Sequence, residues 1–129
     1  MGKMTLLAQL HPLFVHFPIA LVIVAVAGEA VATLTGNRRW HSVAVANVRA
    51  GAAFAVIAAI AGWRLAAGAG ADASSILEWH RWLGTMATVV TVVAALATLG
   101  ADRPPRLGMW IYRMTLLGAA SLVAATGHL

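Results

Sequence analysis

The sequence predicts an all-α integral membrane protein, a four-helix bundle whose helices run up, down, up and down. Of its 129 residues, 61% are hydrophobic and 10% are charged, whereas soluble domains have about 45–50% apolar and about 25% charged residues. A soluble domain of this length has too little interior to bury so much apolar surface. The same composition excludes a disordered chain, which needs low hydrophobicity and high charge.

The first two apolar stretches predict a helical hairpin at the start of a single domain, residues 1–129. Residues 11–34 form the first expected span, which ends at the polar turn 35–39. Residues 42–65 form the second, in which glycine and alanine recur at a spacing of roughly one helical turn. Small residues let helices in lipid approach each other closely, so we expect tight packing along this span.

Two further spans complete the predicted bundle. Residues 68–75, rich in Gly, Ala, Asp and Ser, separate the second span from the third, which covers about residues 77–99. Pro104 and Pro105 end the helical pattern before the fourth span, residues 107–125. Because the connections are short, neighbouring helices should be antiparallel, with both termini on the same side of the membrane.

The basic residues predict the orientation. We call the end of the bundle that holds both termini the histidine end and the opposite end the arginine end. Lys3, Arg64 and Arg81 belong to the histidine end, and six arginines belong to the arginine end. The positive-inside rule therefore predicts that the arginine end is cytoplasmic and that both termini lie outside, in the periplasm if the cell has two membranes. The six are Arg38, Arg39, Arg49, Arg103, Arg106 and Arg113.

The net charge of +5 is explained by this orientation signal. Nucleic-acid binding is not expected, because no basic stripe or basic-aromatic module is present.

Four of the five histidines are expected together at the histidine end. His11 and His16 open the first span, His80 opens the third, and His128 closes the fourth. Ionisable residues in membrane spans usually face the bundle interior and mark function, and histidine is the commonest metal ligand. The pattern predicts a b-type haem with two axial histidines, or a histidine-bound metal. The alternative is that each histidine holds a helix end at the interface, as we expect for solvated His41.

Several features favour haem over a bare metal ion. The absence of cysteine excludes c-type haem, thiolate-bound clusters and Cys-based zinc sites. Arg64 and Arg81 are placed to pair with the two haem propionates. His11 and His16 are five residues apart, about 140° around a helix, which suits two roles better than one shared ion. Aromatic residues for an apolar slot, or for an interfacial belt, are Phe14, Phe17, Trp63, Trp79 and Trp82.

Charged residues also occur within the spans toward the arginine end. Glu29 is expected to form a buried ion pair with Arg49, joined by Arg113 and Asn47, because a lone charge at that depth is costly. A structural role in setting helix register is the simpler interpretation. The alternative is a proton or quinone site.

Three short motifs resemble those of a large bacterial family of small four-span membrane proteins of unknown function. HPLFVHFPIAL at residues 11–21 resembles the family's opening motif HPxxVHFPIxL, HRWLG at 80–84 its third-span signature, and TGH at 126–128 its closing motif. Family members are fused to, or encoded near, c-type cytochromes and periplasmic dehydrogenases. The resemblance therefore implies an electron-transfer role and is consistent with a haem-binding membrane subunit.

These observations predict a b-type cytochrome subunit that passes electrons between a periplasmic or membrane redox protein and the quinone pool. One or two haem b groups would be bound through His16 and His80, with His11 and His128 as a second pair or as supporting ligands. An electron-transfer subunit is favoured over an enzyme, since no nucleophile triad, phosphate loop or carboxylate pair is present. The alternative is a non-haem metal-binding or structural subunit that anchors a larger complex. Membrane lipid and a homo- or hetero-oligomer are the other expected partners.

Overall fold

The computed structural model describes residues 2–68, 75–99 and 106–128. Within these ranges, twelve side chains are not described, namely those of residues 2–5, 7, 8, 11, 68, 106, 107, 127 and 128. The described chain forms four helices and contains no strand. They are α1 (Gly2–Thr35), α2 (Arg38–Gly68), α3 (Ser75–Ala97) and α4 (Arg106–His128).

Each helix is long and apolar enough to cross a membrane, which confirms the predicted all-α, four-helix membrane fold. Each helix contains one apolar stretch, and each stretch overlaps one expected span. In lipid a single chain must satisfy its own backbone polar groups, and a continuous helix does so. The stretches are Pro12–Thr35, Arg38–Ala67, Ser75–Ala97 and Gly108–Thr126.

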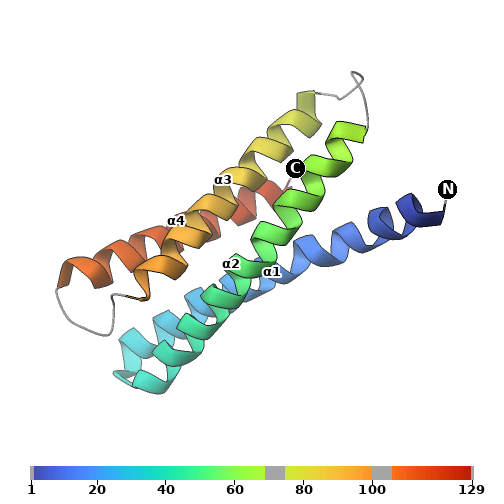
Figure 1. The fold of residues 1–129 in the computed structure, drawn as a ribbon. Helices are drawn as coiled ribbons and strands as arrows, with labels where there is room; N and C mark the ends of the chain where they lie inside the picture. Colours follow the sequence, from blue (N-terminus) through green and yellow to red (C-terminus); the bar gives the residue numbers. More distant parts are fainter. Residues whose placement is uncertain (1, 69–74, 100–105, 129) are drawn as a thin grey trace.

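The helices pack as two hairpins, α1 with α2 and α3 with α4 (Figure 1). Successive helices run in opposite directions, so the start of α1 and the end of α4 lie toward the same end of the bundle. The turn between α1 and α2 lies at the opposite end. These two ends are the histidine end and the arginine end of the sequence analysis.

A tight two-residue turn joins α1 to α2. Gly36 has φ +68° and donates its backbone N–H to the carbonyl of Ala32 at 2.9 Å. Asn37 accepts the backbone N–H of Arg39 on its side-chain oxygen at 3.0 Å, which caps the new helix. As a result, α2 begins at Arg38, four residues earlier than the expected span.

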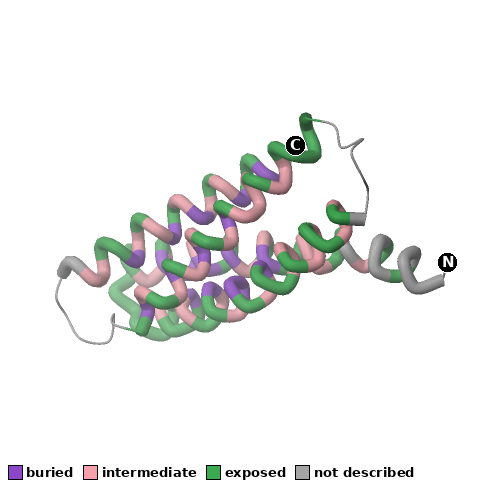
Figure 2. Tube along the Cα trace, turned by 45° about the horizontal axis from the view of Figure 1, so that its top comes forward, coloured by how far each residue is buried: buried purple, intermediate pink, exposed green. Residues whose placement is uncertain are grey.

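The closest packing lies in the half of the bundle near the arginine end. Small residues dominate the first hairpin: a Cβ added to Gly28 would lie 3.3 Å from the Trp40 carbonyl and 3.5 Å from the Ala44 Cβ. Buried residues follow the faces where helices meet (Figure 2). Apolar side chains cover much of the outer surface. The core cluster in this half is Ala25, Ala44, Val48, Ala94, Tyr112 and Leu116.

We expect Gly28→Leu to destabilise the protein by about 1–3 kcal/mol, the usual range for overpacking. The leucine would have to separate α1 from the start of α2. Gly108→Leu is the matched control, because nothing lies within 4 Å of a Cβ added there. Thermal unfolding of the detergent-solubilised protein, followed by circular dichroism, compares the two. Equal unfolding temperatures would contradict the close approach at Gly28.

Candidate functional site

A largely apolar cavity of about 300 Å³ lies between the four helices in the half of the bundle near the histidine end. Its size falls at the lower end of the range of about 300–1,000 Å³ that is typical of small-molecule sites. The α2 wall consists mainly of the small residues predicted for tight packing, Ala55, Ala58, Ala59 and Gly62. Small residues allow close helix packing elsewhere in the bundle. At this position they leave room for a ligand.

Two consecutive residues of α3 bring charge and an imidazole to this cavity. His80 and Arg81 are both half-buried and both line the wall. The Arg81 guanidinium carbon lies 4.9 Å from the centroid of the Trp63 ring, a cation–π contact. Its Nε is buried and has no hydrogen-bond partner among the described residues. A ligand with an acceptor group would satisfy that donor.

The Trp63 side chain of α2 contacts α3 next to Arg81. The Trp63 indole N–H donates to the Thr85 hydroxyl at 2.9 Å, and Thr85 donates to the Arg81 carbonyl at 2.8 Å. Trp63 also meets Trp82 edge to face, with ring centroids 5.6 Å apart. Trp63 therefore joins α2 to α3 beside the cavity and supports the guanidinium from one side.

Of the six predicted site residues, four have described side chains. His80 and Arg81 lie on the cavity wall, whereas the side chains of His16 and Arg64 are exposed and do not line it. The Nδ1 of His16 contacts the carbonyl of Pro12 one turn earlier. His11 lies in α1 and His128 in α4, but their side chains are outside the described residues. The pairing of His16 with His80 stays a prediction.

The described residues include no cluster suited to a bare metal ion. In these parts of the chain, no three His, Asp or Glu side chains come close enough to bind one ion. Because the side chains of His11 and His128 lie outside the described residues, the alternative of a non-haem metal centre stays a prediction. An apolar cavity with one imidazole and one guanidinium is a different kind of site.

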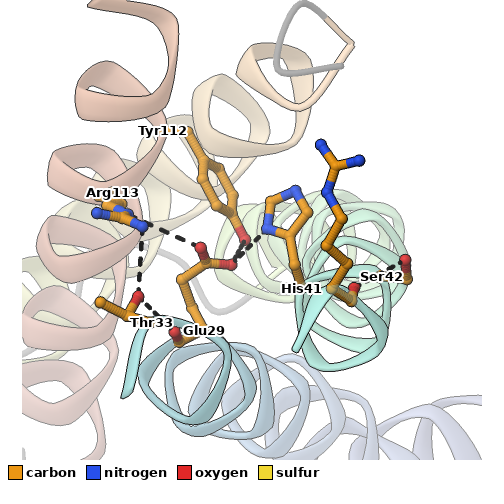
Figure 3. A network of polar contacts seen from close by, with 7 residues as sticks. Glu29, Thr33, His41, Ser42, Tyr112 and Arg113 are labelled. Atoms are coloured by element: carbon orange, nitrogen blue, oxygen red, sulfur yellow. Dashed lines mark hydrogen bonds and ion pairs between the residues drawn. The ribbon is translucent and has the colours of Figure 1, made fainter. Parts of the chain in front are cut away.

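A second polar group of residues surrounds Glu29 near the arginine end (Figure 3). The Glu29 side chain is buried, with the residue 7% exposed. His41 donates from Nδ1 to the carboxylate at 2.9 Å, and the Tyr112 hydroxyl donates at 3.3 Å. The Nε of Arg113 lies 3.8 Å from the other carboxylate oxygen. One carboxylate thus joins α1, α2 and α4, and we call these four residues the Glu29 cluster.

The predicted Glu29–Arg49 pair is wrong, although Arg113 is a partner as expected. The Nε of Arg49 instead donates to the Thr98 hydroxyl at 2.9 Å. The reason is the early start of α2 at Arg38, which moves Arg49 about one turn deeper than the expected span implied. The Asn47 amide donates within its own helix, to the carbonyl of Val43.

The expectation of a solvated His41 is also wrong. Its side chain is 23% exposed and is bonded to Glu29. Position along the chain suggested an interfacial residue, but the tight turn at Gly36 brings the first turn of α2 against the last turns of α1. Sequence reasoning also missed Tyr112. It is the single tyrosine of the chain and precedes Arg113 directly, which is a usable signal in so apolar a span.

The sequence profile of one family, described as "Predicted membrane protein (DUF2231)", matches residues 8–129. The match covers all four helices apart from the first residues of α1. Comparisons with curated proteins and with solved structures gave no match.

We expect Glu29→Gln to lower the free energy of unfolding by about 1.5–3 kcal/mol, the range for hydrogen bonds to charged groups. The substitution keeps the shape of the side chain but leaves Arg113 without its counter-charge. Glu78→Gln, at an exposed position of α3, is the matched control and should change stability by no more than about 0.5 kcal/mol. Thermal unfolding in detergent measures both. Equal effects would show that the Glu29 cluster contributes nothing to stability.

Proposed function

The chain belongs to the DUF2231 family of predicted membrane proteins, and we propose that it acts as a membrane-anchored b-type cytochrome subunit. It would bind haem b in the cavity at His80 and pass electrons between a periplasmic or membrane redox protein and the quinone pool. The observation that carries this proposal is the largely apolar cavity whose wall combines a half-buried imidazole with a guanidinium. One donor of that guanidinium has no partner among the described residues.

The residues present fit the three chemical parts of a haem. The macrocycle needs a flat apolar surface, and Ala58, Ala59 and Gly62 offer one without projecting side chains. An axial position needs an imidazole nitrogen, and His80 places an imidazole on the wall. The propionates need cations near a helix end, and the Arg81 Nε, which has no partner among the described residues, could donate a charged hydrogen bond. When bound, the haem supplies one-electron transfer.

The second axial position would be filled from α1. His11 precedes the wall residue Val15 by four residues, so helix periodicity puts the two positions on the same face. His16 has its Nδ1 at the Pro12 carbonyl, which leaves Nε2 as the nitrogen for a metal. Both histidines are therefore candidates for the second ligand beside His80.

The position of the cavity supports electron exchange at one face of the membrane. The cavity lies in the half of the bundle near the histidine end, and most of its wall is apolar. Trp63 and Trp82 meet edge to face there, and the Arg81 guanidinium lies over the Trp63 ring. A single group at this depth cannot carry charge across the whole bilayer, so both partners would approach from the histidine end.

We further propose that the arginine end faces the cytoplasm of a bacterium and that both termini are periplasmic. The support is the excess of arginine at that end, where the arginines with described side chains are Arg38, Arg39, Arg49 and Arg113. The haem would then lie near the periplasmic face.

The purified protein is expected to show haem b bands in a reduced-minus-oxidised spectrum. His80→Ala should lose most of the bound haem, because it removes an axial ligand, whereas His41→Gln, at the other end of the bundle, should retain it. A wild-type spectrum without haem bands would overturn the proposal, and a spectrum unchanged by His80→Ala would overturn the site. If the protein held stoichiometric zinc or copper without haem, the metal-binding alternative would replace it.

Single variants of His11 and His16 identify the second ligand. The low-spin signature of the reduced protein should be lost in one of them and kept in the other. Arg81→Gln should weaken haem retention by about 10–100-fold, the equivalent of one charged hydrogen bond. Arg49→Gln is its matched control, since Arg49 does not line the cavity.

The orientation is testable because the chain has no cysteine of its own. Ser75→Cys at the histidine end should react with a membrane-impermeant thiol reagent on intact cells. Asn37→Cys in the α1–α2 turn should react only after permeabilisation. The reverse pattern would place the arginine end in the periplasm and contradict the proposed orientation.

A further inference from the structure

A second cavity, of about 390 Å³, opens at the arginine end beside the Glu29 cluster. Residues of α1, the α1–α2 turn, α2 and α4 line it, and most of them are polar. It differs in this respect from the apolar cavity near the histidine end. Its lining includes Thr33, Asn37, Arg38, Ser42 and Arg113 beside Glu29 and His41.

The charges around this cavity favour an anion. Arg38 and Arg113 reach it from two different helices, while Glu29 is the one carboxylate on its wall. That carboxylate already has three partners in His41, Tyr112 and Arg113. The lining therefore carries a net positive charge whether or not His41 is protonated.

The guanidinium of Arg113 has one N–H group without a hydrogen-bond partner among the described residues. Its Nε lies 3.8 Å from Glu29, close enough for attraction but too far for a hydrogen bond. Among the described residues this buried nitrogen has no hydrogen-bond partner. The remaining contact of the guanidinium is a bond of 3.3 Å from its terminal nitrogen to the Thr33 hydroxyl.

The beginning of α2 adds to the positive field. Arg38 is the first residue of this 31-residue helix, so the positive end of its dipole lies at the cavity. The three remaining residues of the wall, Ala32, Gly36 and Met109, have no polar side chain. A polar, cationic site with one apolar side at a helix end matches the boundary between phospholipid headgroups and acyl chains.

We propose that this cavity binds the phosphate group of an anionic phospholipid. Guanidinium groups recognise phosphate oxygens by paired, charge-assisted hydrogen bonds, and basic pockets between membrane helices suit lipid headgroups. Arg38 and Arg113 would hold the phosphate from opposite sides, and Met109 would contact the glycerol end of the lipid. This site is independent of the proposed haem, which lies in the other half of the bundle.

The test is binding of phosphatidylglycerol and phosphatidylcholine to the full-length protein in detergent, measured by native mass spectrometry. Wild type should bind the first phosphatidylglycerol at least about tenfold more tightly than phosphatidylcholine. Arg38→Gln should abolish that preference, because it removes a charged hydrogen bond to the phosphate. Arg39→Gln makes the same change of charge at the next, exposed residue, which does not line the cavity, and should keep it.

A second variant distinguishes loss of lipid binding from loss of the fold. Arg113→Lys keeps a positive charge beside Glu29 but loses the planar fork, so it should weaken phosphatidylglycerol binding while leaving the unfolding temperature near that of wild type. Equal losses in Arg38→Gln and Arg39→Gln would mean general surface attraction and overturn the proposal. Displacement of the lipid by excess inorganic phosphate would also overturn the proposal, because it would identify a site for free anions. None of these results depends on whether haem is bound.

Discussion

The buried carboxylate of Glu29 is the interaction on which the arrangement of the helices depends. A charge within a membrane span is costly unless it is paired, and Glu29 finds its partners on α2 and α4 rather than on its own helix. The hydrogen bonds from His41 and Tyr112 and the attraction of Arg113 fix three helices at one depth. Interhelical hydrogen bonds act together with van der Waals packing when helices associate in lipid, so we infer that this cluster helps to set the register at the arginine end.

The rest of the bundle follows from having one fixed end. Near Glu29 the helices pack around alanine, valine and the fully buried Tyr112 ring, with Gly28 allowing α1 and α2 to touch. Farther along α2 the small residues continue, but the opposing helices do not fill the space, and a cavity remains. Small side chains thus serve close packing in one half and an open site in the other. The Trp63–Thr85 bond keeps α2 and α3 together beside that opening.

The two cavities differ in chemistry as they differ in position. The one near the histidine end is largely apolar, with His80 and Arg81 as its ionisable residues, which suits a flat hydrophobic cofactor bearing carboxylates. The one at the arginine end is polar and cationic, which suits the phosphate of a lipid. In both, an arginine has a buried Nε without a partner among the described residues. A donor left in this way is costly, and a ligand acceptor at each site would remove the cost.

The sequence by itself determined the four spanning helices and the partnership of Glu29 with Arg113. These follow from rules that act along the chain: lipid demands continuous apolar helices, and a buried charge demands an opposite one. Only the tertiary structure decided that His41 rather than Arg49 joins Glu29, and that His80 lines the cavity while His16 does not. Sequence gives the depth of a residue along its helix, but the direction a side chain faces depends on where the helix begins and how its neighbours are rotated. An early start of four residues in α2 was enough to change the partner of the buried carboxylate.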